Sequence, residues 1–170
     1  MALSGQEILD YLNFSYAGWF NTMKSPTDHL IRFTENSQGR LQTRRAYYNF
    51  DSAMGLQYEV DVSKPAGEMV KILGLADGKT FDLDHKYLVA LNSYRGNGGG
   101  GHLVEGAGIA PEELVDRLVN TTTKDLRYNM MKWIEERKVI TPKPSGQWTV
   151  IPGYLFESGK KQDYPILFRN

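Results

Sequence analysis

Residues 56–73 read LQYEVDVSKPAGEMVKIL, and this stretch carries the clearest structural pattern in the chain. Residues 56–61 alternate apolar with polar side chains, which is the period-two pattern of a half-buried strand. The turn-forming residues Lys-Pro-Ala-Gly follow at 64–67, and 69–73 carries a second strand. We therefore expect a β-hairpin here.

Upstream of the hairpin, the sequence predicts an amphipathic helix over 5–20. Ser4 and Glu7 have the spacing of a capping box, in which each side chain bonds the backbone N–H of the other residue. Behind them, apolar residues recur at helical spacing. They are Ile8, Leu9, Leu12, Tyr16, Trp19 and Phe20. Residues 21–46 are polar and irregular, which indicates a surface excursion.

Downstream of the hairpin, further elements are expected. The apolar run 87–91 has the length of a central strand that is covered on both faces. Pro111 suits the first position of a helix over 111–119. Thr122 or Thr123 can cap a second helix. Its buried face would consist of Leu126, Met130, Trp133 and Ile134.

Two short segments near the C-terminus complete the pattern. Residues 148–151 are expected to form a strand, and residues 164–168 a short edge segment. Helices mixed with hairpins and one buried strand indicate an α+β or mixed α/β domain.

The composition limits the class of protein. The chain has 170 residues, of which 41% are apolar and 24% charged, as in one globular domain. The net charge is zero, so nothing favours a nucleic-acid polymer or an anionic membrane. The absence of cysteine excludes disulfides and thiolate metal sites, and fits the cytoplasm or a bacterial periplasm. No apolar run approaches the ~20 residues of a membrane span, and any export signal is expected upstream.

No catalytic residue is expected in this chain. The histidines, His29, His85 and His102, are far apart, and none belongs to a spaced metal-ligand cluster such as HExxH. His85 follows two aspartates, but a solvated turn explains that stretch more simply than a metal site. There is neither a GxSxG elbow nor a cysteine nucleophile.

The stretch with the strongest functional signal is 92–102, which reads NSYRGNGGGGH. Five of the six residues 96–101 are glycine, so the backbone there can adopt positive φ and approach another molecule closely. Exposed amides in such a loop can bind anions or ribose oxygens. It is not a P-loop, because no Gly-Lys-Ser/Thr follows. Composition alone leaves a binding loop and a plain turn equally open.

Two motifs, taken together, resemble a known family. The first is Phe50-(x)4-Gly55-Leu56-Gln57-Tyr58, continued by Asp61, Pro65, Gly67 and Val70; the second is Asn92-(x)-Tyr94-(x)2-Asn97-Gly98-Gly99-(x)-Gly101. The pair resembles the C-terminal domain of the 5′-nucleotidase family, over nearly the whole chain. This family includes 5′-nucleotidase/UDP-sugar hydrolases, 2′,3′-cyclic-nucleotide 2′-phosphodiesterases and ecto-5′-nucleotidase. The resemblance implies a layered α/β sandwich with a mixed sheet.

The resemblance also implies a nucleoside site. In this family two aromatic rings hold the base between them, and the spacing places these rings at Phe50 and Tyr94, although Phe50 taken alone would be a core residue. Asn97 and the backbone of 96–99 would contact the base or the ribose. The substrate-binding residues implied are Phe50, Tyr94, Arg95, Gly96, Asn97, Gly98 and Gly99.

Three positions depart from the family pattern. Gly100 stands where many members carry an aspartate that binds the ribose hydroxyls, so strict recognition of a ribonucleoside is in doubt. His102 stands where an aromatic residue often follows the loop, and Gln6 where some members have a phosphate-contacting cation.

The family further implies what surrounds this chain. Residues 1–170 would be the C-terminal, substrate-binding domain of a two-domain phosphoric ester hydrolase. Two divalent metal ions would lie in an N-terminal metallophosphoesterase domain outside this chain, so the chain by itself would be inactive. The partners would be a nucleotide or nucleoside and that N-terminal domain, in the periplasm or outside the cell. A non-catalytic nucleoside-binding or adaptor module of the same fold is the alternative.

Overall fold

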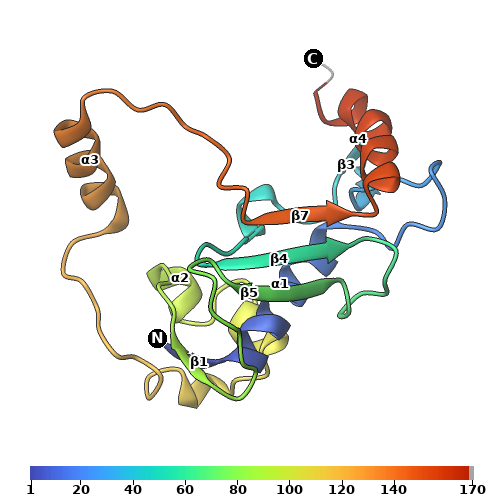
Figure 1. The fold of residues 1–170 in the computed structure, drawn as a ribbon. Helices are drawn as coiled ribbons and strands as arrows, with labels where there is room; N and C mark the ends of the chain where they lie inside the picture. The colour runs from blue at the N-terminus through green and yellow to red at the C-terminus, as the bar shows by residue number, and fades with distance from the viewer. Residues whose placement is uncertain (169–170) are drawn as a thin grey trace.

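The centre of the fold is a three-stranded mixed sheet with the strand order β5–β4–β7 (Figure 1). In the computed structural model, which describes residues 1–168, β4 (Leu56–Asp61) pairs antiparallel with β5 (Val70–Leu75) and parallel with β7 (Trp148–Ile151). The predicted hairpin and the predicted strand near the C-terminus are confirmed. With the helices described below, this mixed sheet gives the expected α+β class.

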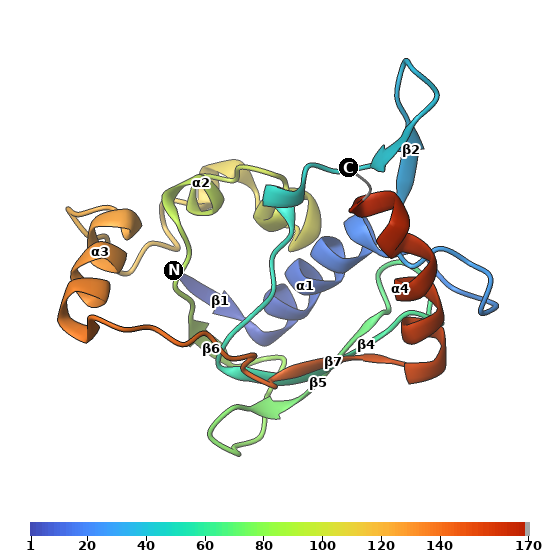
Figure 2. The same cartoon turned by 90° about the horizontal axis from the view of Figure 1, so that it is seen from above.

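The first helix, α1 (Gly5–Trp19), lies on one face of this sheet (Figure 2). The predicted helix and its capping box are both confirmed. The Ser4 hydroxyl accepts from the N–H of Glu7, and the Glu7 carboxylate accepts from the N–H of Ser4. The apolar stripe of α1 joins the core formed with β4, where Tyr16 Oη lies 2.9 Å from Tyr58 Oη. These two buried hydroxyls are hydrogen-bonded to each other, so neither lacks a hydrogen-bond partner in the core.

A separate antiparallel ribbon consists of β1 (Ala2–Ser4) and β6 (Lys86–Leu88). The prediction of a central strand over 87–91 is wrong. Among the described residues β6 pairs with β1 alone, and Leu88 is 76% exposed. An apolar run becomes a central strand only where other elements cover both of its faces. Here the hydrogen bonds of the ribbon end at the pair of Met1 and Val89, and the chain then turns towards the glycine-rich stretch.

The segment 21–46, expected to be irregular, contains a small hairpin of β2 (Phe33–Glu35) and β3 (Leu41–Thr43). The C-terminal helix α4 (Gly153–Leu167) lies beside it (Figure 1). The edge segment predicted at 164–168 is therefore wrong. Residues 164–167 form the last turn of α4 and Phe168 caps it, so their backbone N–H groups bond along the helix and are unavailable to a sheet.

The helix α3 (Leu126–Arg137) stands apart from the rest of the molecule in both views (Figures 1 and 2). A helix was predicted there, but its cap is Asp125, whose carboxylate accepts from Tyr128 N, and neither Thr122 nor Thr123. No residue of α3 is buried, so the predicted buried face is also wrong. Helical periodicity tells which side chains share a face, but not whether anything covers that face.

The helix expected over 111–119 is limited to a 3-10 turn, η3 (Pro111–Glu113). Three other short elements, η1 (Tyr47–Asn49), α2 (Ser93–Gly96) and the π-helical turn η2 (His102–Gly106), gather around the glycine-rich stretch. No helix in the described part of the chain is long and apolar enough to cross a membrane.

Candidate functional site

The glycine-rich stretch begins with α2, a single helical turn. Asn92 caps this turn, since its Oδ1 accepts from the N–H of Arg95 at 2.8 Å. The turn separates two neighbouring side chains. Tyr94 is 55% exposed, whereas Arg95 is 3% exposed. One short helix therefore presents an aromatic ring outwards and directs a guanidinium into the interior.

The glycines that follow have conformations that other residues rarely adopt. Gly98, Gly100 and Gly101 have φ angles of 85°, 77° and 78°, in the left-handed region. The N–H of Gly99 donates to the carbonyl of Tyr94 at 2.8 Å and closes the turn. The stretch is thus a compact folded turn, not a flexible linker, and its geometry requires glycine.

The ring of Tyr94 lies directly against the backbone of Gly99. A Cβ at Gly99 would be 2.6 Å from two ring carbons of Tyr94 and from its carbonyl oxygen. Atoms do not approach so closely, so position 99 must be glycine while the ring keeps this place. Asn97, at the end of α2, is also exposed. The loop therefore offers one ring, one amide and bare main chain on its outer side.

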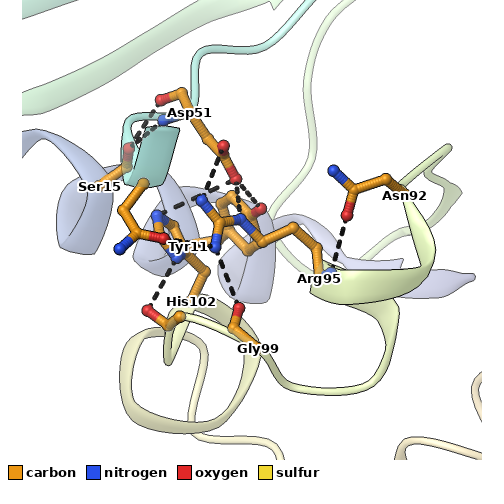
Figure 3. Close-up of polar contacts among 9 residues, drawn as sticks. Tyr11, Ser15, Asp51, Asn92, Arg95, Gly99 and His102 are labelled. Carbon is orange, nitrogen blue, oxygen red and sulfur yellow. Dashed lines mark hydrogen bonds and ion pairs between the residues drawn. The ribbon is translucent and has the colours of Figure 1, made fainter. Parts of the chain in front are cut away.

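The side chain of Arg95 forms a two-pronged ion pair with Asp51 (Figure 3). Its Nε lies 2.6 Å from Oδ2 of Asp51 and its Nη2 lies 3.1 Å from Oδ1. Its Nη1 donates to the carbonyl of Gly99 at 3.1 Å. Arg95 is predicted to contact substrate; it also lines the pocket described below, and its contact with a ligand stays a prediction. Its nitrogens are engaged in the interior, so Arg95 supports the loop from below.

Asp51 is itself fastened to α1. The hydroxyl of Ser15 donates to the Asp51 carbonyl at 2.7 Å and accepts from the Asp51 N–H at 2.9 Å, and Tyr11 Oη donates to the carboxylate. Burial alone would raise the pKa of Asp51, but the hydrogen bonds from Arg95 and Tyr11 outweigh it and hold the pKa below its usual value. Asp51 is therefore ionised at neutral pH and keeps Arg95 in place.

His102, just after the loop, is completely buried. Its Nδ1 lies 3.1 Å from the carbonyl of Gly100, and its ring packs on Tyr11 and Phe14 with centroids 4.9 Å and 5.2 Å away. Its Nε2 has no hydrogen-bond partner among residues 1–168. Burial and the charge of Arg95 lower the pKa of His102. It is a neutral residue of the interior and does not face a ligand.

Phe50 lies in a cluster of aromatic rings under β7. Its centroid is 5.3 Å from that of Tyr16, 5.6 Å from Trp19 and 6.5 Å from Trp148. Among the described residues the rings of Phe50 and Tyr94 form no contact with each other. Phe50 therefore packs on the core in this structure, and the predicted base sandwich of Phe50 and Tyr94 stays a prediction.

No sequence motif marks three further residues of this site as functional. Tyr11, Ser15 and Asp51 come from α1 and from the segment before β4. Tyr11 and Ser15 share one side of α1, four positions apart, and Asp51 follows directly on Phe50 of the family motif. Their joint function depends on a contact between distant segments, which no local pattern shows.

The remaining predicted site residues lie together in the turn. A side chain at position 96 would contact Met1, and one at position 98 would contact the side chains of Leu114 and Val104. These glycines allow the turn to pack closely on the core, while Asn97 stays exposed. Their contact with a ligand stays a prediction.

A pocket of about 550 Å³ opens beside the ion pair. Its lining includes the polar residues Asp51, Asn92 and Arg95, and apolar residues from β1, α1, β4, β5, β6 and the segment 89–91. Phe50 and Tyr94 are not among its lining residues. Tyr94 and the outer face of the glycine turn therefore lie outside this pocket.

The described residues contain no group of three or more His, Cys, Asp or Glu that could hold a metal ion. Residues 82–85, with two aspartates and a histidine, are exposed and do not form such a group. The divalent metals implied by the family resemblance thus have no fitting ligand set in this part of the chain.

Comparison with known proteins gives three matches. The model of the family described as 5′-nucleotidase, C-terminal domain, matches residues 1–105. The chain is 31% identical, over 161 residues, to the trifunctional nucleotide phosphoesterase protein YfkN of Bacillus subtilis, covering 88% of this chain and 10% of that protein. Its fold is similar to that of a Staphylococcus aureus protein described as a 5′-nucleotidase, with a TM-score of 0.56, 18% identity, and coverage of 88% of this chain and 26% of the other. The chain therefore spans only a small part of the length of either.

Proposed function

The chain belongs to the family of 5′-nucleotidase C-terminal domains, and we propose that it is the nucleotide- or nucleoside-binding part of a phosphoesterase that hydrolyses nucleotide phosphate esters. The observation that carries this proposal is the glycine turn, which holds the exposed ring of Tyr94 against the backbone of Gly99. The name of the Bacillus subtilis relative, a nucleotide phosphoesterase, supports the same class of substrate.

The binding mode follows from the surface that the turn offers. Tyr94 can stack on the face of a base, which contributes ~1–3 kcal/mol per base in proteins that bind single strands. Asn97 and the main chain of the turn lie beside it and can hydrogen-bond the base edge or the ribose. In this proposal Phe50 packs among the rings around Tyr16, and Tyr94 alone stacks on the ligand.

The hydrolytic step belongs to another part of the protein in this proposal. Two divalent ions in an N-terminal metallophosphoesterase domain would lower the pKa of a bound water and clamp the phosphoryl oxygens. This chain would hold the nucleoside end of the substrate. Location in the periplasm or outside the cell goes with this family context and is part of the proposal.

Titration of the purified chain with adenosine tests the role of Tyr94. We expect Tyr94→Ala to weaken binding by about tenfold or more, because the stacking energy is lost. Phe50→Ala should mainly lower the thermal midpoint, because it leaves a hole among Tyr16, Trp19 and Trp148. Tyr154→Ala is the matched control, since Tyr154 is 66% exposed on α4 and should leave affinity unchanged. Equal affinity of wild type and Tyr94→Ala would contradict the proposed binding mode.

A further inference from the structure

The pocket beside the ion pair has an apolar lining that is open to solvent. Its walls come from β1, α1, the start of β4 and β6, among other segments. Two of its lining residues, Met54 and Leu88, are 80% and 76% exposed, so no part of the described chain covers them. Apolar side chains gathered around a concave surface are typical of a place where another apolar surface binds.

The apolar side of α3 is also exposed. Four apolar side chains share this side of the helix, and each is at least 40% exposed. They are Leu126, Met130, Trp133 and Ile134. The other side carries charged residues, among them Lys132 and Glu135, whose Nζ and Oε2 lie 2.7 Å apart. A helix with one apolar and one charged side is suited to lie on an apolar surface with its charges in water.

Both ends of the segment that carries α3 are fastened to walls of this pocket (Figure 1). At its start, the carbonyl of Arg117 accepts from the N–H of Ala2 in β1 at 2.8 Å, and β1 forms one of the walls. At its end, the side-chain oxygen of Gln147 accepts from the N–H of Gly55, a lining residue, at 3.0 Å. The residues between them, 118–146, are here called the strap. The strap therefore leaves the domain at one wall of the pocket and returns at another.

The strap is long enough to bring α3 onto the pocket. Eight residues, 118–125, precede the helix and nine, 138–146, follow it. At about 3.4 Å per residue, these connections can extend to about 27 Å and about 30 Å. The helix has 12 residues and is about 18 Å long, since each residue adds about 1.5 Å. Because both connections start at the pocket walls, α3 can lie across the opening without any change in the strands.

We propose that the strap is a lid, which moves from the open position of this structure and seats the apolar side of α3 on the pocket rim around Met54 and Leu88. Attachment at both ends holds α3 at a high local concentration, which favours the helix of the same chain over that of a second copy. Closure also shields the ion pair of Asp51 and Arg95, which lines the pocket, from water on that side. The open form predominates in the free chain, and the closed form is the minor state. The inference does not depend on the proposed function, because both surfaces belong to the chain itself.

Engineered disulfides test the closure, and the chain suits them because it contains no cysteine. Met130→Cys is combined with Met54→Cys in one variant and with Leu88→Cys in another. All three residues are exposed, so the domain should stay folded. In the matched control of each pair, Glu135→Cys replaces Met130→Cys. The control keeps the same connections but places the thiol on the charged side of α3.

The measured quantity is the equilibrium constant for the intramolecular disulfide in a glutathione buffer, at low concentration of the chain. We expect this constant to be roughly tenfold larger with Met130→Cys than with Glu135→Cys in one or both pairs, because only a seated helix favours one side over the other. Amide exchange on the oxidised chains gives a second measurement. Oxidised Met130→Cys variants should exchange the amides of α3 at least roughly tenfold more slowly than their reduced forms, and oxidised controls should not.

Two results would overturn the inference. If Met130→Cys and Glu135→Cys give equal constants with both rim positions, α3 does not seat its apolar side on the pocket. If the disulfides form between two chains and increase with the concentration of the chain, α3 seats on a second copy and not on its own domain.

Discussion

At the residue scale, the site depends on charges that are satisfied inside the protein. Arg95 and Asp51 neutralise each other, and Tyr11 and Ser15 complete the hydrogen bonds of Asp51. Burial and the hydrogen bond to Asp51 both raise the pKa of Tyr11, so its hydroxyl stays a donor throughout the physiological range. With these groups paired, the outer face of the turn can be uncharged main chain without an unpaired charge beneath it.

The buried imidazole of His102 should make stability depend on pH. Burial and the charge of Arg95 lower its pKa in the folded state, whereas the unfolded chain takes up a proton near pH 6.5, roughly the value of a free histidine. The unfolded state therefore binds more protons below that pH. The stability that the neutral imidazole provides is therefore complete above about pH 6.5. As the pH falls from there towards the pKa of the folded state, the free energy of unfolding decreases by up to about 1.4 kcal/mol per pH unit.

The measurement is urea unfolding at pH 7.5 and pH 5.5. His102→Phe should lose this part of the pH dependence, because phenylalanine takes no proton in either state. His85→Gln serves as the control, since His85 is exposed, and its pH dependence should match that of wild type. If the free energy of unfolding depends on pH equally in wild type and in His102→Phe, His102 is not the source of this pH dependence.

At the scale of elements, α1 and α3 show how packing decides the stability of a helix. α1 has a complete capping box and buries one face against the sheet. α3 has an N-cap, Asp125, but no buried residue. A helix of 12 residues without tertiary contacts is marginal in water.

Amide hydrogen exchange should separate these two helices. We expect amides of α3 to exchange at rates close to those of an unstructured peptide, and amides in the middle of α1 to be protected until the whole domain unfolds. The short strands of the β1–β6 ribbon should fall between them. Protection of α3 equal to that of α1 would mean that something covers the apolar side of α3 in solution.

On the scale of the whole molecule, the chain holds a candidate binding surface but no metal cluster among its described residues. The purified chain should therefore neither release phosphate from AMP nor open 2′,3′-cyclic AMP to an adenosine monophosphate, with or without Mg²⁺ or Mn²⁺. A phosphate assay for AMP and chromatography of the products for the cyclic nucleotide, each over a wide range of concentration of the chain, provide the measurement. Metal-dependent turnover that scales with the concentration of the chain would contradict the division of labour proposed here.

The local sequence pattern alone determined those helices and strands whose sequence signatures span only a few residues. The capping box at Ser4, the alternation in 56–61 and the strand at 148–151 were predictable, because each depends on neighbours in sequence. The positive φ angles of the glycine-rich stretch were predictable for the same reason, but its compact form was not. The family was also evident from two spaced motifs, and the match over residues 1–105 confirms it.

Only the tertiary structure decided what each element faces. It left α3 uncovered, paired only 86–88, where the apolar run begins, with β1, and placed Phe50 among core rings instead of beside Tyr94. It also turned Arg95 inwards to Asp51, a partner 44 residues away. Burial and ion pairing are properties of segments that meet in space, and a sequence pattern records which side chains could be covered, not what covers them.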